Sequence, residues 1–274
     1  MTNNNIIFWC VIICLIIIII VLSILLARKN NSSRDNFKKF NPIEYKIKEQ
    51  NIWPFPNKIQ TGSLKNPKSL TVSSKLSIKD FPISLQAVLK PVVDDFNNFV
   101  GFSKSSKNKL YNISINNPSH TDHNGSERYQ LHISNGKGIV IKSDTYIGTV
   151  RALTTLSQLI RKDGNNYVIK NIDINIDDEP HYQYRSAMLD TTRHYLPVET
   201  ILRTIKCMAF NKLNHLHLHL TDAQSFPLNI GPITNRLSIG KTDIDGNTGA
   251  YSKEEIYTKK DISQIVEYAH AYGI

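Results

Sequence analysis

In residues 184–220, two short apolar segments predicted as strands flank a predicted amphipathic helix. Residues 184–190 read YRSAMLD, and residues 213–220 read LNHLHLHL. Between them, Pro197 suits the first turn of a helix whose apolar residues recur on one face. Strands joined by a helix in this order predict a parallel sheet, either doubly wound or closed into a barrel.

The flanking sequence continues the alternation of strands and helices. Toward the C-terminus, Thr258-Lys-Lys-Asp261 forms a capping box ahead of another helix. Toward the N-terminus, alternation and helical spacing predict strands at 127–133, 138–141, 167–169 and 172–176 and a helix over 145–160. We therefore expect a small α/β domain over residues 49–180, ending at an acidic break, and a second domain over residues 181–274.

The N-terminus differs from the rest of the chain. Residues 1–5 are a short leader, and residues 6–27 form an uncharged, Ile-rich run of about 33 Å as a helix, which is enough to cross a bilayer core. Because the run is long and no basic leader precedes it, we favour one transmembrane anchor over a cleaved signal peptide. Residues 28–48 are polar and basic and read as a linker.

Composition excludes several classes of protein. The chain has 274 residues, 41% of them hydrophobic, so it is not disordered, and its three cysteines exclude a disulfide scaffold. Only Cys207 lies outside the apolar run, and we expect it to pack within its helix. The net charge of +10 comes from scattered lysines without a basic helix face, so we expect no nucleic-acid partner.

The sequence around the anchor does not decide its orientation in the membrane. Basic residues follow the run at residues 6–27 and none precedes it, which favours a cytosolic body. Glycosylation sequons favour the opposite orientation. They begin at Asn30, Asn31, Asn112 and Asn124.

Two polar clusters follow the predicted strands of residues 184–220. Asp190 to Tyr195 comes after the first strand, and Asp222 comes two residues after the second. In a parallel barrel, such positions build the active site. The second strand also carries His215, His217 and His219 on one face. A strand-borne zinc site is one interpretation, but buried, hydrogen-bonded histidines are the one that we favour.

The motifs of these two clusters and of the segments around them resemble those of the β-N-acetylhexosaminidases of glycosyl hydrolase family 20. The resemblance is carried by Asp190-Thr-Thr-Arg193-His194-Tyr-Leu-Pro, by His217-Leu-His219-Leu-Thr-Asp222-Ala-Gln-Ser-Phe-Pro and by Gly249-Ala-Tyr-Ser. Earlier, Trp53-Pro-Phe-Pro and residues 148–159 are similar to the family's N-terminal domain. The resemblance extends from about residue 51 to residue 274.

The resemblance implies an α/β fold: an α+β N-terminal domain followed by the opening βα units of a truncated (β/α)8 TIM barrel. It implies removal of terminal N-acetylhexosamine from glycans without a cofactor or metal. The sugar's own acetamido group acts as the nucleophile, an exception to the two-carboxylate scheme. Arg193 and Asp222 match residues of the sugar-binding pocket. We expect Asp190, His194, His217 and His219 to support them. For Arg193, a salt bridge that braces its loop is the alternative.

The family's catalytic Asp-Glu pair has no counterpart in the sequence, so we assign no catalytic residue and expect no hydrolysis by this chain alone. We weigh three readings: an incomplete hexosaminidase, a membrane-anchored module that binds glycans or another subunit as a homodimer or heterodimer, and a zinc hydrolase. The family's precedent leads us to expect the body in the lumen, in the lysosome or outside the cell. We also expect residues 51–180 to be more stable than residues 181–274, because a partial barrel leaves strand edges unpaired.

Overall fold

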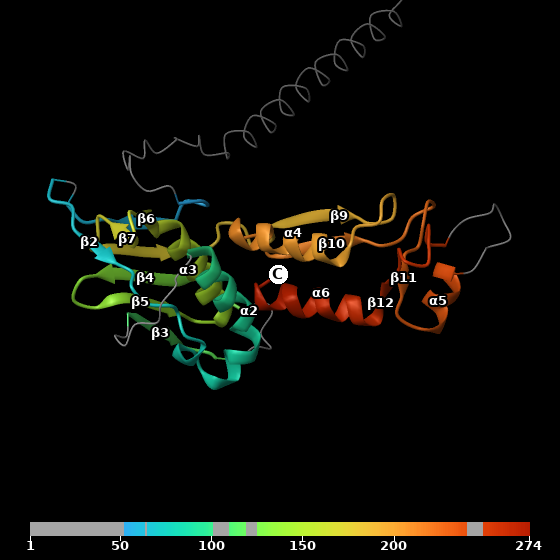
Figure 1. Cartoon of the computed structure of the whole chain (residues 1–274), viewed down its shortest axis with the longest axis horizontal. Coiled ribbons are helices and arrows are strands. Elements are labelled where there is room, and N and C mark those ends of the chain that lie inside the picture. The colour runs from blue at the N-terminus through green and yellow to red at the C-terminus, as the bar shows by residue number, and fades with distance from the viewer. Residues whose placement is uncertain (1–51, 64, 101–109, 119–124, 240–248) are drawn as a thin grey trace, which may run out of the picture. The chain divides into compact units, whose positions relative to one another are not determined.

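The computed structural model describes residues 52–63, 65–100, 110–118, 125–239 and 249–274 (Figure 1). The predicted leader, anchor and linker of residues 1–48 lie outside these residues, as do Asn30, Asn31 and Asn124. Among the helices that the structure describes, none has the length and apolar character needed to span a bilayer.

The N-terminal part is built on a five-stranded sheet whose strand order is β1-β8-β4-β5-β3. All neighbouring strands are antiparallel except β3 and β5, which are parallel. A separate antiparallel sheet has the order β2-β7-β6. The strands are β1 (Lys58–Gln60), β2 (Ser69–Thr71), β3 (Tyr111–Ile115), β4 (Tyr129–Ser134), β5 (Gly138–Ser143), β6 (Arg161–Asp163), β7 (Asn166–Lys170) and β8 (Ile174–Asp178).

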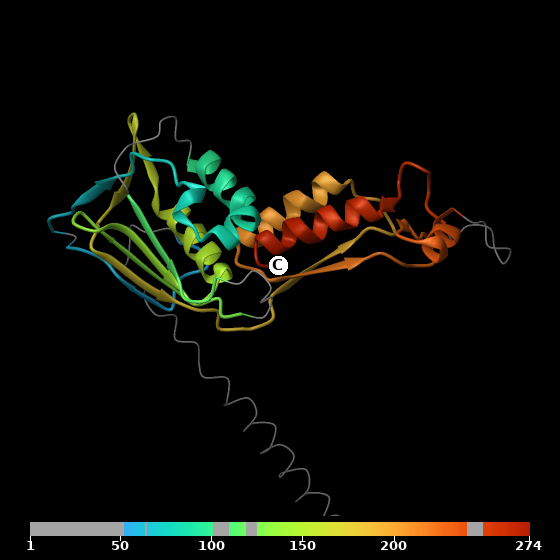
Figure 2. The same ribbon diagram turned by 90° about the horizontal axis from the view of Figure 1, so that it is seen from below.

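Helices cover one face of the five-stranded sheet (Figure 2). Helix α3 (Tyr146–Leu159) packs on β4 and β5, and its N-cap Thr145 accepts a hydrogen bond from the amide of Gly148 at 3.3 Å. Helix α2 (Ile83–Val100) packs against α3 and follows the 3-10 turn η1 (Ile78–Asp80). Helix α3 confirms the expected helix, whereas α2 was not predicted.

The C-terminal part repeats the predicted strand–helix order. Strands β9 (Ser186–Asp190) and β10 (His215–His219) are parallel and flank α4 (Val198–Phe210), which begins directly after Pro197. A second parallel pair joins β11 (Leu228–Asn229) to β12 (Tyr257–Thr258), with α5 (Pro232–Ile239) between them. Helix α6 (Lys259–Ala271) starts at the predicted capping box, in which both reciprocal hydrogen bonds form.

Helices α4 and α6 pack together on one side of the β9–β10 pair (Figure 2). Leu216 and Leu218 of β10 join the hydrophobic core on that side. On the other side, His215 and His217 are exposed, and Met188 is 59% exposed. The expectation of buried histidines is therefore wrong for these two residues, because no described element covers their face.

The expectation that Cys207 packs within its helix is also wrong. Cys207 is exposed, because it lies on the side of α4 away from the buried Ile201, Ile205, Met208 and Ala209. Trp53, at the start of the described chain, is 66% exposed. Its indole Nε1 donates to Asn211 Oδ1 at 3.1 Å, so it contacts the end of α4 through a hydrogen bond.

The hydrophobic core is continuous across residue 180. Buried side chains of α4, α6 and β12 belong to the same cluster as those of β4, β5 and α3. Residues 51–274 accordingly form one compact unit. The boundary at residue 180 stays a prediction about domains, and the lower stability of residues 181–274 stays a prediction as well.

Candidate functional site

The predicted site residues lie at the carboxyl ends of β9 and β10. Asp190 and His219 are the last residues of these strands and face each other in the register of the pair. Parallel strands bring their carboxyl ends to the same edge of a sheet, so the loops that follow them meet there. Asp222 lies three residues beyond His219 on the second loop.

Arg193 joins the two loops. Its guanidinium lies 2.5 Å from Asp190 Oδ2 through one nitrogen and 2.5 Å from Asp222 Oδ2 through the other. The side chain of Arg193 is 52% exposed. We call Asp190, Arg193, His219 and Asp222 the Arg193 cluster. The cluster contains both sugar-binding candidates, Arg193 and Asp222. It also contains the salt bridge that was the alternative interpretation of Arg193, because this ion pair braces the loop that carries it.

Hydrogen bonds fix the loop that carries Arg193. Asp190 Oδ1 accepts from the amide of Thr192 at 3.0 Å, from its hydroxyl at 2.8 Å and from the amide of Arg193 at 3.1 Å. Thr191 donates its amide and hydroxyl to the carbonyl of His219, and Ser225 donates its hydroxyl to the carbonyl of Thr192 at 2.7 Å. The two loops are therefore tied together independently of the Arg193 side chain.

The electrostatics of the cluster keep both carboxylates ionised. Hydrogen bonding from the Arg193 side chain, with added bonds from Thr192, holds the pKa of Asp190 far below its usual range. His219 Nε2 lies 3.1 Å from Asp222 Oδ2 and lowers the pKa of Asp222, with the amide of Ala223 and the charge of Arg193 adding to the effect.

These features define what the cluster can do chemically. An ionised carboxylate accepts hydrogen bonds from hydroxyl groups, and a guanidinium donates through a planar fork. The exposed cluster thus suits a polar ligand rich in hydroxyls. A general acid needs a pKa near the working pH, which neither depressed carboxyl has. The cluster is therefore suited to binding, and no carboxyl within it is suited to proton donation.

The other predicted residues do not join the cluster. His194 follows Arg193 but is exposed, and His217 is exposed on β10 beside Met188 in the register. Within the described part of the chain, no three His, Cys, Asp or Glu side chains come together as metal ligands. The zinc interpretation thus gains no support from the described residues.

Tyrosines near the cluster were missed as site residues. Tyr251, which is 50% exposed, donates its hydroxyl to the carbonyl of Arg193 at 3.2 Å. Tyr195 stacks on Tyr257 with ring centroids 4.8 Å apart. Tyr251 belongs to the motif Gly249-Ala-Tyr-Ser, and this motif is the signal in the sequence that points to it.

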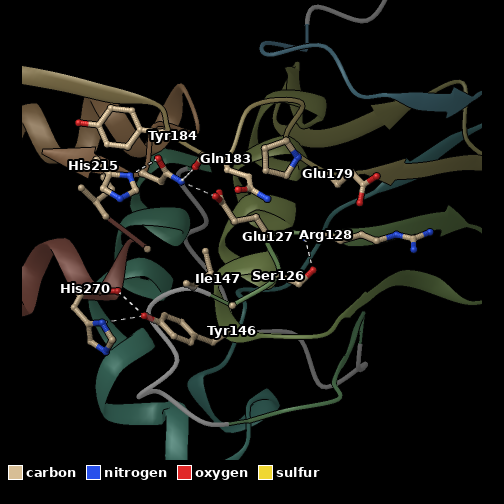
Figure 3. Close-up of a pocket in the computed structure, with 15 residues that line it drawn as sticks. Ser126, Glu127, Arg128, Tyr146, Ile147, Glu179, Gln183, Tyr184, His215 and His270 are labelled. Carbon is tan, nitrogen blue, oxygen red and sulfur yellow. Dashed lines mark hydrogen bonds between the residues drawn. The ribbon is translucent and has the colours of Figure 1, made fainter.

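A cavity of about 660 Å³ lies at the opposite, amino-terminal end of the same strands (Figure 3). Its lining includes Glu127 and Tyr146 from the N-terminal part and Tyr184 and His215 at the strand starts. His270 of α6 faces Tyr146, whose hydroxyl lies 3.0 Å from the ring nitrogen Nδ1. His215, which the zinc interpretation included, lines this cavity, whereas the sugar-binding candidates Arg193 and Asp222 do not.

Comparison with known proteins identifies the two parts of the chain. The family model described as "Glycosyl hydrolase family 20, catalytic domain" matches residues 182–274, and the model described as "beta-acetyl hexosaminidase like" matches residues 83–159. The chain is 34% identical over 233 residues to beta-hexosaminidase subunit B1 of Dictyostelium discoideum, covering 81% of this chain and 39% of that protein.

A mammalian relative and a solved structure show similarity to the same kind of enzyme. Beta-hexosaminidase subunit beta of Mus musculus is 31% identical over 243 residues, covering 81% of this chain and 42% of that protein. The exo-β-N-acetylglucosaminidase of Vibrio harveyi, solved with N-acetylglucosamine, superposes with a TM-score of 0.63 at 25% identity, covering 82% of this chain and 35% of that one. The chain spans about two fifths of the length of the curated relatives it matches.

The order of the matched regions, the relatives and the mixed α/β fold lead to one assignment. The chain belongs to glycosyl hydrolase family 20, as a β-N-acetylhexosaminidase-like sequence that comprises the N-terminal domain and the first part of the catalytic domain.

Proposed function

We propose that the Arg193 cluster binds the terminal N-acetylhexosamine of a glycan. The observation that carries the proposal is a half-exposed guanidinium held 2.5 Å from each of two carboxylates at the carboxyl ends of parallel strands. Arg193 would donate to sugar hydroxyls, and Asp222 would accept from one of them. The solved Vibrio harveyi relative, which was determined with N-acetylglucosamine, supports this class of ligand.

We further propose that residues 181–274 are the opening βα units of a (β/α)8 barrel. Parallel sheets are normally covered on both faces, whereas the described residues cover one face of the β9–β10 pair. The exposed face, with Met188, His215 and His217, would be the interior of such a barrel. The Arg193 cluster would then lie at the end of the barrel where active sites are built.

The 274-residue chain would bind the sugar without hydrolysing the glycosidic bond. The family's substrate-assisted reaction needs an acid that protonates the leaving oxygen. Asp178-Glu179 is the only Asp-Glu pair in the sequence, and it lies at the end of β8 rather than after a barrel strand. Asp178 is buried against Lys212 at 2.8 Å, which leaves it unsuited to this role.

Ligand-observed NMR tests the binding proposal. Saturation transfer from the protein to N-acetylglucosamine is expected for the unmodified chain and is expected to disappear in Arg193→Ala. Arg128→Ala is the matched control, because Arg128 is also an exposed arginine paired with a carboxylate, that of Asp177 at 2.9 Å. Equal transfer in unmodified chain and Arg193→Ala would contradict the proposal.

A hydrolysis assay tests the proposed absence of catalysis. Purified chain is expected to release no chromophore from a chromogenic N-acetyl-β-glucosaminide above a buffer blank. Turnover that Arg193→Ala abolishes would overturn this part of the proposal, because it would require an acid within the 274 residues.

We also propose that the folded part faces the lumen, anchored through residues 6–27. Asn112 supports this orientation, because it is exposed on β3 at the edge of its sheet. In a eukaryotic cell, endoglycosidase is expected to increase the mobility of the chain, and Asn112→Gln with Asn124→Gln is expected to reduce that shift. A chain that endoglycosidase leaves unchanged and that a cytosolic protease reaches would refute the orientation.

A further inference from the structure

Arg151 of α3 is a buried cation that contacts three separate segments. Its side chain is 2% exposed, and its Nε lies 2.7 Å from Glu127 Oε2. Its remaining nitrogens donate to backbone carbonyls of the C-terminal part. These are Leu213 at 3.3 Å, Tyr272 at 3.1 Å and Gly273 at 2.8 Å.

Each of these carbonyls marks a defined place in the C-terminal part. Leu213 lies in the turn between α4 and β10, and Tyr272 and Gly273 end α6. A cation at the carboxyl end of a helix is favoured by the helix dipole. Gly273 has φ of +67°, and an added Cβ would lie 2.6 Å from Ile147 Cγ2, so α6 ends in close contact with α3.

Glu127 extends the contact to β9. The same Oε2 that pairs with Arg151 lies 2.5 Å from Arg185, the residue directly before β9. Its other oxygen accepts from Asn214 Nδ2 at 2.9 Å, directly before β10. Figure 3 shows Glu127 pointing toward the segments that carry Gln183 and His215.

A second buried pair fixes the same turn. Lys212 has a left-handed backbone with φ of +55°, and its Nζ lies 2.8 Å from Asp178 Oδ2 and 3.0 Å from the hydroxyl of Tyr129. Its carbonyl accepts from Arg185 Nε at 2.8 Å. We call Glu127, Arg151, Asp178, Arg185 and Lys212 the strand-start network.

We propose that the N-terminal domain is the template on which the first βα units of the catalytic part assemble, with Arg151 as the positioning residue. Arg151 fixes the start of β10 and the end of α6 directly, and it fixes the start of β9 through Glu127. Buried charges are costly unless every partner is in place, so the network tolerates few alternative arrangements of these segments. This proposal stands independently of sugar binding, because the network lies at the opposite end of the strands from the Arg193 cluster.

Hydrogen exchange on the full chain, measured by mass spectrometry, tests the template role. Arg151→Lys keeps the charge beside Glu127 but loses the fork that reaches the three carbonyls. We expect amides of β9, β10 and the last turn of α6 to exchange at least about tenfold faster, while β4, β5 and β8 change by less than about twofold. Arg128→Lys, which alters an exposed arginine–carboxylate pair of the same domain, is expected to change neither group.

Equal acceleration in both groups of strands would overturn the proposal, because it would make Arg151 an ordinary core residue. Unchanged exchange throughout would overturn it as well. If Arg151→Lys does not fold, Asn214→Ala keeps every buried charge and removes the link between Glu127 and β10. It is expected to accelerate β9 and β10 alone, and acceleration of β4 and β5 to the same extent would contradict the template role.

Discussion

The two ends of the β9–β10 pair carry the same chemistry in different surroundings. At the amino-terminal end, Arg151 and Glu127 lie 2.7 Å apart with side chains 2% and 10% exposed. At the carboxyl-terminal end, Arg193 and Asp190 lie 2.5 Å apart with side chains 52% and 25% exposed. Distance alone does not separate a structural ion pair from one that is free to exchange partners. Exposure to solvent does, because water or a ligand can replace a partner only where it can reach the charge.

The largest expected effect is on stability, from Arg151→Met. Arg151→Met breaks the buried ion pair with Glu127, which keeps Arg185 as its remaining cation. It also removes the donor of three backbone carbonyls at the strand and helix ends. Removing one member of a buried ion pair costs about 3–5 kcal/mol. Chemical denaturation of the full chain is the measurement, and Arg128→Met is the control. A loss no larger than that of the control would remove the distinction between buried and exposed pairs.

The next effect is a dependence of stability on pH that originates in Glu127. Burial raises the pKa of Glu127, but Arg151 and Arg185 outweigh burial and lower it below its ordinary value of 4.5. The unfolded chain therefore takes up the proton first, so stability is full above pH 4.5 and decreases as pH falls below it. Glu127→Gln should reduce this slope in urea unfolding between neutral and acidic pH. The control Asp163→Asn, at an exposed pair with Lys170, should keep the slope, and equal slopes in all three proteins would contradict the prediction.

A smaller effect is expected at the carboxyl-terminal end from Ser225→Ala. Ser225 is 1% exposed and donates its hydroxyl to the carbonyl of Thr192. Thr192 is also buried. Loss of this bond should cost about 1–2 kcal/mol in chemical denaturation. Ser114→Ala, at an exposed position of β3, serves as the control and should leave stability unchanged. If both variants behave alike, the loops are not held together as described.

The smallest effect on stability is expected from Arg193→Met. Its ion pairs are exposed, and the hydrogen bonds that Thr191, Thr192 and Ser225 donate to His219, Asp190 and Thr192 hold the loop without it. Thermal unfolding should shift less for Arg193→Met than for Ser225→Ala. A larger shift would assign Arg193 a structural role comparable to that of Arg151.

Sequence patterns predicted the elements whose residues interact locally. Helix α3, the capping box of α6 and the parallel pair β9–β10 follow from spacing within short windows. Helix α2 was missed although its buried residues recur at helical spacing, since Pro91 lies within it. Strands β1, β2 and β6 are three residues each, too short for alternation to show.

The Arg193 cluster and the strand-start network also differ in how far the sequence predicted them. The Arg193 cluster was predictable because parallel strands bring their carboxyl ends together, so residues after two successive strands must meet. The strand-start network joins residues from Glu127 to Gly273 through side chains that come together only after both parts fold. Its member Asp178 was interpreted as part of an acidic domain break, because its partner Lys212 is 34 residues away.

We propose that the exposed Arg193 binds a sugar, whereas the buried Arg151 stabilises the fold. NMR observation of the arginine Nε–H signals during titration with N-acetylglucosamine tests both halves at once. We expect the Arg193 signal to move with sugar concentration while those of Arg151 and Arg128 stay in place. An unmoved Arg193 signal, or an Arg151 signal that moves to the same extent, would contradict it.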